Sequence, residues 1–152
     1  MAGAGSILCD AALVFKDKLT PDIASFASHF GTLTQWLNDI KSIDEDYEER
    51  QYTPYVLEYY VYNRLLDDLQ KQVFCYLCDV FSDEKHLKPF KDDPLKLAFL
   101  DTMRAFLMLK MFEGVAINKN KFSPAFYQAV EEKSPIPLEY LLFIRNKFQL
   151  KM

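Results

Sequence analysis

The chain has 152 residues and only four glycines, which excludes folds built on many tight β-turns, because hairpins and bulges depend on glycine. Its 18 basic and 22 acidic side chains give a net charge of -4 and no basic patch, which excludes an ordinary nucleic-acid surface. We therefore expect an all-α fold, a single compact orthogonal or bundle-like domain of six or seven helices at residues 6–152, after a disordered N-terminus at residues 1–5.

Prolines mark most of the predicted helix starts. A Thr, Asp or Ser oxygen can accept a hydrogen bond from the first turn of a helix, and proline suits the next position because it lacks an N–H group. We predict that a helix starts at each such pair, and that Gly31 and Gly114 stop helices. The four pairs are Thr20–Pro21, Thr53–Pro54, Asp93–Pro94 and Ser123–Pro124.

The expected elements follow from these signals and from apolar residues that recur with helical spacing. The first helix, from Ser6 to about Leu19, has Ile7, Ala11, Phe15 and Leu19 on one face. Later elements, in chain order, are a short helix at 21–30, a helix from 31 to about 40, an acidic loop at 44–49, a long helix at 54–81, a helix at 94–113, a short extended piece at 115–117, a helix from 124 and a last helix from 138.

Two of these helices are expected to form the core. The 54–81 helix would span about 42 Å, so a kink or break within it is left open. Its second half carries one charge, Asp79, and is expected to be buried on most sides. The 94–113 helix is apolar around much of its circumference, and we expect it to be central, with Phe106 in the core.

The residue types that usually carry chemistry form no recognised motif. Cys75 and Cys78 make a C-x-x-C pair inside a helix, where core cysteines are the favoured interpretation and zinc or redox roles stay open. His29 is expected to cap a helix C-terminus, and His86 to lie on a surface loop. The acidic loop fails the calcium-loop pattern, because Glu49 stands where glycine is needed. We therefore expect no metal, no cofactor and no catalytic residue, although an enzyme with an unrecognised site stays open.

Three cysteines and a start without a basic secretory region favour an intracellular protein, cytoplasmic or nuclear. The longest apolar stretch, residues 95–112, carries four charged side chains, so no membrane span is expected.

One resemblance to a known family covers residues 26–112. The run Glu48-Glu49-Arg50-Gln51-Tyr52-Thr53-Pro54 followed by Glu58-Tyr59, and the later run from Phe106 to Phe112, resemble stretches of the BART-like domain. This is a helical module of proteins that bind ADP-ribosylation-factor-like small GTPases. The resemblance implies an all-helical effector domain that binds a GTP-loaded small GTPase. Residues 7–19 do not match the family's leucine-rich first helix, and nothing after Phe122 has a counterpart.

The aromatic content gives the remaining functional lead. Tyrosine has a broad apolar face and a polar tip, which suits interfaces, and Tyr60 lies outside the apolar stripe of its helix. We expect a non-enzymatic protein–protein interaction module, an adaptor or a subunit of a larger assembly, and self-association is left open. The partner is another protein, with a basic surface that the acidic loop would attract. The predicted partner-binding residues are Glu48, Glu49, Tyr60 and Arg64.

Overall fold

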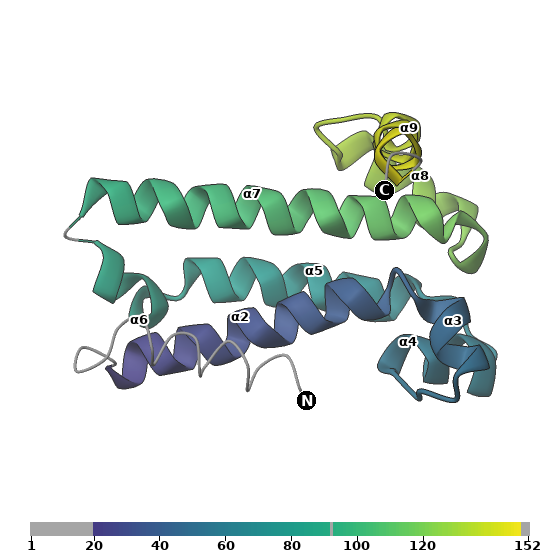
Figure 1. Ribbon diagram of the computed structural model, residues 1–152, viewed down its shortest axis with the longest axis horizontal. Coiled ribbons are helices and arrows are strands. Elements are labelled where there is room, and N and C mark those ends of the chain that lie inside the picture. Colours follow the sequence, from purple (N-terminus) through teal and green to yellow (C-terminus); the bar gives the residue numbers. More distant parts are fainter. Residues whose placement is uncertain (1–19, 92, 150–152) are drawn as a thin grey trace. The chain divides into compact units, whose positions relative to one another are not determined.

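The computed structural model describes residues 20–91 and 93–149, and this part of the chain is all-α, as predicted (Figure 1). Its eight α-helices are α2 (Pro21–Asp39), α3 (Ile43–Glu48), α4 (Pro54–Val56), α5 (Asp67–Ser82), α6 (Glu84–Leu87), α7 (Pro94–Ile117), α8 (Pro124–Lys133) and α9 (Leu138–Gln149). Short segments of other helical types are η2 (Leu57–Val61), η3 (Lys88–Phe90) and η4 (Lys119–Lys121). The predicted disordered tail at residues 1–5 and the predicted helix at 6–19 lie outside the described residues.

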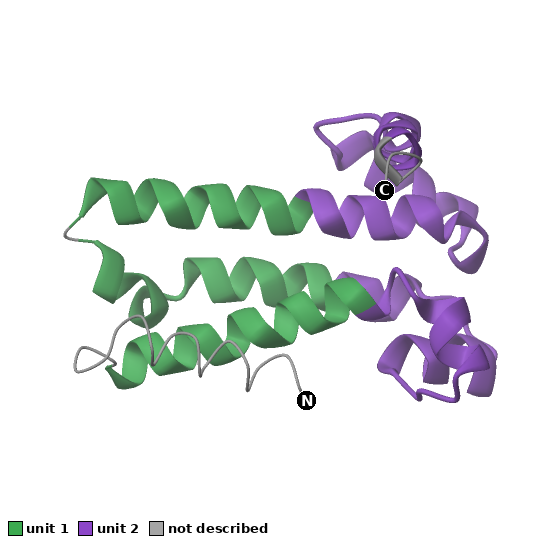
Figure 2. Cartoon of the chain, viewed as in Figure 1, with its two compact units in different colours: residues 1–38, 72–108 green, residues 39–71, 109–152 purple. Residues whose placement is uncertain are grey.

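The chain divides into two compact units, coloured separately in Figure 2. Unit 1 contains residues 1–38 and 72–108, and unit 2 contains residues 39–71 and 109–152. Helices α2, α5 and α7 contribute residues to both. The expectation of one domain at residues 6–152 stays a prediction.

Aromatic rings hold the core of unit 1 together. The ring of Phe26 on α2 lies 5.8 Å from that of Phe81, 5.5 Å from that of Phe90 and 6.1 Å from that of His86, at edge-to-face angles. Edge-to-face pairs are favourable because the positive edge of one ring meets the negative face of another. The aliphatic part of this core comprises Leu33 and Leu37 on α2, Val73, Leu77 and Val80 on α5, and Leu100 and Leu107 on α7.

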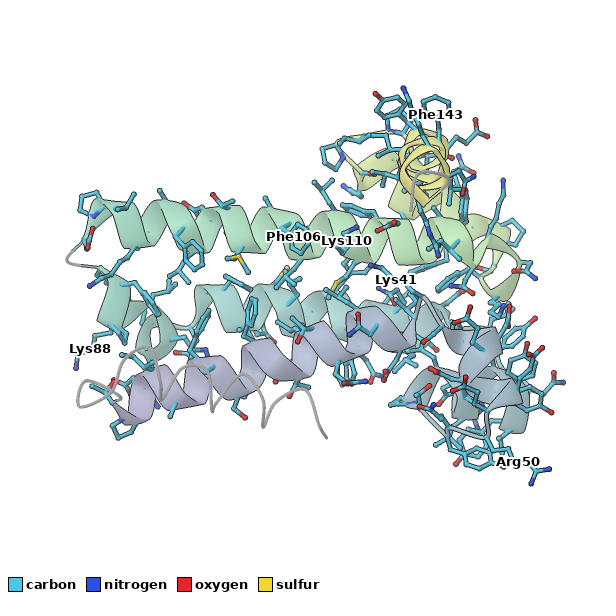
Figure 3. All side chains as sticks on the ribbon, viewed as in Figure 1. Lys41, Arg50, Lys88, Phe106, Lys110 and Phe143 are labelled. Carbon is cyan, nitrogen blue, oxygen red and sulfur yellow. The ribbon has the colours of Figure 1, made fainter. Side chains whose placement is uncertain are left out.

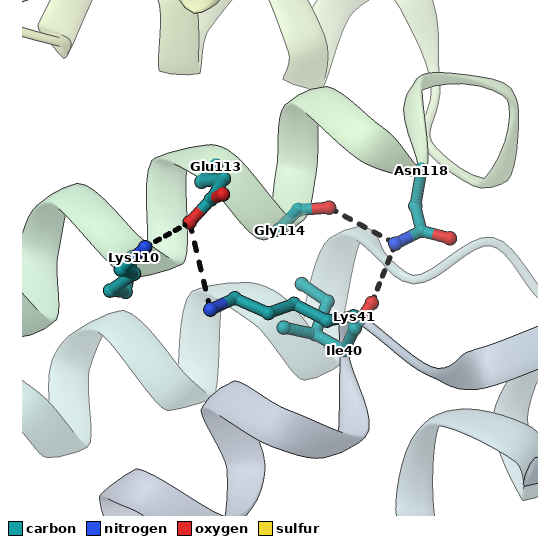
Figure 4. A network of polar contacts seen from close by, with 6 residues as sticks. All are labelled: Ile40, Lys41, Lys110, Glu113, Gly114 and Asn118. Carbon is teal, nitrogen blue, oxygen red and sulfur yellow. Dashed lines mark hydrogen bonds and ion pairs between the residues drawn. The ribbon is translucent and has the colours of Figure 1, made fainter. Parts of the chain in front are cut away.

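Unit 2 packs around a close approach between Ile40 and Gly114 of α7 (Figure 4). The Asn118 amide holds the two segments together, because its Nδ2 donates to the Ile40 carbonyl at 2.6 Å and to the Gly114 carbonyl at 3.1 Å. Nearby, the Glu113 carboxylate lies 2.8 Å from the Lys110 ammonium and 3.6 Å from that of Lys41. The buried apolar side chains of unit 2 also include Ile43, Tyr55, Val56, Leu66, Met111, Val115, Phe122 and Leu138.

All four proline pairs start helices, as predicted. Thr20, Thr53, Asp93 and Ser123 each accept a hydrogen bond from a backbone N–H two or three residues later. The helices that begin there are α2, α4, α7 and α8, so the local capping signal was sufficient to locate them.

The two glycine stops and two other predicted element types were wrong. Gly31 lies inside α2, which is one continuous helix rather than two, and Gly114 lies inside α7, which continues through residues 115–117. Gly114 serves a close contact instead, because a Cβ there would lie 2.6 Å from Ile40 Cγ2. The predicted acidic loop is helical over α3, with Asp44, Glu45 and Asp46 in the first turn, where the helix dipole favours them.

The predicted long helix at 54–81 is interrupted. It is divided into α4, the π-helix η2 and, after a break, α5. Asn63, in the break, has φ 52°, a left-handed conformation that a continuous right-handed helix cannot contain. Tyr62, directly before Asn63, is exposed.

Predicted burial was also wrong at several positions. Cys75 and Cys78 are exposed on α5, not core residues. Phe106 is half exposed, and the first half of α7 is largely exposed rather than central. His86 is buried on α6 rather than at the surface of a loop, and His29 lies in the middle of α2, so it caps no helix end.

Candidate functional site

Exposed aromatic and aliphatic side chains gather in one segment of unit 2, residues 47–65. Exposed tyrosines are typical of binding surfaces because a broad apolar face and a hydroxyl can both contact a partner. We call this set the tyrosine surface. Its members are Tyr47, Tyr52, Tyr60, Val61, Tyr62 and Leu65.

The net charge of the protein originates from the same segment. Residues 43–65 contain six acidic and two basic side chains, whereas the other 129 residues contain 16 of each. Asp44, Glu45, Glu48 and Glu49 are exposed, while Asp46 is buried and accepts a hydrogen bond from the Ser42 hydroxyl. The tyrosine surface therefore carries a concentrated negative charge.

Tyr60 connects η2 to α3. The N–H of Tyr62 donates to the carbonyl of Leu57 five residues earlier, at 2.8 Å, which is the hydrogen bond that defines a π-helix. From this wider turn the Tyr60 ring stacks on that of Tyr47, with centroids 3.9 Å apart and planes inclined by 9°. Glu48 and Glu49 follow Tyr47 directly in the chain, so the stack brings Tyr60 beside the acidic end of α3.

Asp44 fixes the position of the Tyr60 ring in this stack. The Tyr60 hydroxyl donates to Asp44 Oδ1 at 2.6 Å, and the Lys121 ammonium lies 2.8 Å from Oδ1 and 2.9 Å from Oδ2. The side chain of Lys121 is only 4% exposed, so Asp44 compensates a nearly buried charge. The Lys121 ammonium also lies 5.3 Å from the centre of the Tyr59 ring.

The electrostatics of this cluster follow from its contacts. The hydrogen bond to Asp44 raises the pKa of Tyr60 to about 12, because losing the proton would place two negative charges together. Burial raises the pKa of Asp44, but hydrogen bonds from Lys121 and Tyr60 outweigh it, so the pKa of Asp44 is lowered. Near neutral pH Tyr60 is therefore a neutral phenol and Asp44 a carboxylate, the two states that their hydrogen bond requires.

Arg50 adopts a strained backbone conformation at the end of α3. Its φ is 59°, its N–H donates to the Tyr47 carbonyl, and the N–H of Gln51 donates to the Asp46 carbonyl. This is the Schellman pattern, in which the residue after the helix cap is left-handed and is usually glycine. The arginine side chain at this position extends away from the ribbon of unit 2 (Figure 3).

The predicted site residues are only partly brought together. Tyr60 stacks on Tyr47 and thereby lies at the helix α3 that carries Glu48, whereas Arg64 contacts other residues. The Arg64 guanidinium lies 3.8 Å from the Glu58 carboxylate and 5.5 Å above the Tyr62 ring. Arg64 is thus held beside Glu58 and Tyr62.

Sequence reasoning missed the residues that position Tyr60. Tyr47 and Asp44 lie in a segment predicted to be a loop, where no helical spacing related them to Tyr60. Lys121 lies 77 residues after Asp44, and its charge alone does not distinguish it from the other lysines. The crowding of tyrosines was the one available signal.

A second polar cluster lies in unit 1, around a pocket of about 410 Å³. His86 Nδ1 lies 3.2 Å from the Val80 carbonyl, which can only accept a hydrogen bond, and Nε2 lies 3.3 Å from the Ser25 hydroxyl. His29 hydrogen-bonds through Nδ1 to the Tyr76 hydroxyl. Asp22, Asp79, Asp83 and Lys85 complete the lining.

Three carboxylates and one lysine line this pocket beside the Ser25–His86 pair. The carboxylates of Asp22, Asp79 and Asp83 would repel an oxyanion that develops there. Burial, and then the nearby His86, lower the pKa of His29, while Asp83 opposes them. Within residues 20–91 and 93–149, no group of three or more His, Cys, Asp or Glu side chains is placed to bind one metal ion.

Comparison with known proteins gives no match: no family model, no curated protein and no solved structure is similar enough to count. The resemblance of residues 26–112 to the BART-like domain therefore stays a prediction. No helix among the described residues is long and apolar enough to cross a membrane.

Proposed function

We propose that the chain is a non-enzymatic helical interaction module that binds another protein through the tyrosine surface. The observation that carries the proposal is the coincidence of exposed tyrosines and net negative charge in residues 43–65. Rings supply contact area at low cost in conformational entropy, and the carboxylates supply long-range attraction.

The partner is a protein segment that carries arginine or lysine beside aliphatic side chains. A guanidinium or ammonium group is attracted both to the face of a tyrosine ring and to a carboxylate. Glu48 and Glu49 are exposed and directly follow Tyr47, whose ring stacks on that of Tyr60, so the same short segment offers both kinds of group.

The rigidity of the surface supports a binding role. Tyr60 is fixed by a hydrogen bond to Asp44, a stack on Tyr47 and an edge contact with Tyr59, whose ring centre is 5.1 Å away. A pre-organised ring loses little freedom when a partner binds. The left-handed backbone at Arg50 is further support, because strained residues cluster at functional sites.

The test uses a displayed library of random peptides, selected on the whole protein. We expect the enriched sequences to carry arginine or lysine beside aliphatic residues. Their binding should be lost in the variant Glu48→Lys with Glu49→Lys. The matched control is Glu131→Lys with Glu132→Lys, because these two adjacent glutamates are also exposed, on α8, and the change in net charge is identical.

The control should retain binding, because Glu131 and Glu132 lie outside the tyrosine surface. If net charge alone attracted the peptides, both pairs of substitutions would weaken binding equally. Enriched peptides that are acidic, or that bind both variants equally, would contradict the proposed surface. Far-UV circular dichroism of both variants verifies that the helices are intact.

A further inference from the structure

The first half of α7 presents an apolar stripe in unit 1. Leu95 is 79% exposed, Phe99 60% and Phe106 50%, and Thr102 is exposed between them. These positions follow each other at intervals of four, three and four residues. This is the spacing by which one helix packs along another, so the stripe has the pattern of a helix–helix seam.

Three residues of the stripe, Leu95, Phe99 and Thr102, line a surface hollow of about 590 Å³. Its lining is apolar except for Lys96 and Thr102, and the Lys96 ammonium lies 3.7 Å from the Asp93 carboxylate. Large apolar side chains that line a surface hollow are a common feature of docking sites for amphipathic helices. The residues of the lining are Phe90, Leu95, Lys96, Ala98, Phe99 and Thr102.

We propose that the occupant of this stripe is the chain's own N-terminal segment, residues 6–19, docked as an amphipathic helix. Its sequence contains the same spacing as the stripe, with Leu8, Ala12, Phe15 and Leu19 at intervals of four, three and four. Leu8 and Leu19 are eleven residues apart, as are Leu95 and Phe106. Both stretches are therefore about 16 Å long as helices.

Because α2 packs beside the hollow, the N-terminal segment that precedes α2 can reach the stripe over a short distance. The ring of Phe26 lies 5.5 Å from that of Phe90, and Phe90 lines the hollow. Thr20 precedes Phe26 by six residues, or about 9 Å of helix. Thr20, which follows the N-terminal segment in the chain, is therefore within reach of the Leu95 end of the stripe.

This connection fixes the direction of the docked helix. Helix α7 begins at the end of the stripe where the N-terminal segment ends, so the two run antiparallel. Leu19 then lies near Leu95, Phe15 near Phe99 and Leu8 near Phe106. An amphipathic helix of another protein could reach the stripe only after residues 6–19 leave it.

The experiment measures the reactivity of a cysteine in the stripe. In the full chain with Cys9, Cys75 and Cys78 changed to serine, Phe99→Cys is labelled with a maleimide reagent. The same reaction is followed after Leu8→Ser, Phe15→Ser and Leu19→Ser are added. The matched control is Asp101→Cys, on the same helix outside the stripe, where the side chain is 75% exposed.

We expect the cysteine at 99 to react at least about tenfold more slowly than the one at 101, and the three serine substitutions to remove the difference. Equal rates at both positions in the intact chain would overturn the proposal. Slow labelling at 99 that survives the serine substitutions would also overturn it, because another element would then cover the stripe. Slow labelling that disappears on dilution would overturn it in favour of a second copy of the chain.

Discussion

Replacing Gly114 by alanine tests the close packing of α7 on Ile40. An alanine Cβ would lie 2.6 Å from Ile40 Cγ2, 3.1 Å from Cδ1 and 3.3 Å from Cγ1. Ile40 is 1% exposed, so it has little room to move. Carbon atoms pack favourably at about 3.5–4.0 Å, so the substitution forces a displacement inside the core.

Two effects of opposite sign decide the result. Overpacking of a core costs about 1–3 kcal/mol, whereas alanine in place of glycine inside a helix gains about 1 kcal/mol. We therefore expect Gly114→Ala to lower the free energy of unfolding by about 1 kcal/mol. In a protein that carries Ile40→Ala the clash is absent, so the same change should raise the free energy of unfolding by up to about 1 kcal/mol.

Urea unfolding of the wild type, both single variants and the double variant measures this reversal. Ala105→Gly, at an exposed position of the same helix, calibrates the cost of glycine in α7. If Gly114→Ala stabilises the wild type, or changes both backgrounds by the same amount, the close contact with Ile40 does not explain the glycine.

Three further predictions concern Gln70, Arg50 and His29. The Tyr55 hydroxyl donates to Gln70 Oε1 at 2.8 Å, and Gln70 Nε2 is buried with no hydrogen-bond partner in the described part of the chain. Tyr55→Phe should therefore lower the free energy of unfolding by about 1–2 kcal/mol in urea, and adding Gln70→Met should restore most of that loss, because no unpaired polar group remains. Arg50→Gly should raise the melting temperature, because the left-handed conformation costs an arginine about 1 kcal/mol and glycine adopts it without that cost. A lower melting temperature would contradict the Schellman argument. The pKa of His29 is lowered in the folded protein, so below its usual value of 6.5 the unfolded chain binds more protons and the free energy of unfolding falls as the pH falls. Urea titrations at successive pH values from neutral to mildly acidic should show this decline, and His29→Gln should reduce its slope.

Local signals predicted the helix starts because their physics is local. At Thr20, Thr53, Asp93 and Ser123 the hydrogen bond that starts the helix joins residues two or three apart. No distant part of the chain is needed to make it. The start of α8 gains an additional long-range contact, since Asp67 accepts from both the backbone and the hydroxyl of Ser123, but the local pair already defined the start.

Glycine was misleading because its role depends on what lies opposite. At Gly114 the missing Cβ leaves space for Ile40, which is 74 residues earlier in the chain. Only the fold reveals that neighbour. The sequence shows a residue without a side chain, and this is equally consistent with a helix end and with a close approach.

Burial was misjudged where a helix is apolar on more than one side. In the first half of α7, Phe106 and Phe99 are exposed while Leu100 and Leu107 are buried. Hydrophobicity alone does not rank these faces, because all four side chains are large and apolar. Cys75 and Cys78 illustrate the same difficulty on α5, where few charges indicated burial but the core side is formed by Val73 and Leu77.

The tyrosine surface depends both on local sequence, which could be read in advance, and on long-range contacts, which could not. Its composition was visible in the sequence, and Tyr60 was predicted to lie away from the core, which its 37% exposure agrees with. The predicted geometry assumed a continuous α-helix, whereas η2 and the left-handed Asn63 interrupt it. What holds Tyr60 in place is the Asp44–Lys121 ion pair, whose partners lie far apart in sequence.

That ion pair also explains why an acidic surface can tolerate a buried lysine. Lys121 would be costly to bury alone, and Asp44 compensates its charge while keeping an oxygen for Tyr60. The pair contributes no net charge, so the negative potential at the tyrosine surface comes from the remaining exposed carboxylates at the end of α3. Positioning and attraction are therefore assigned to different acidic residues: Asp44 fixes the ring, and Glu48 and Glu49 remain exposed beside it.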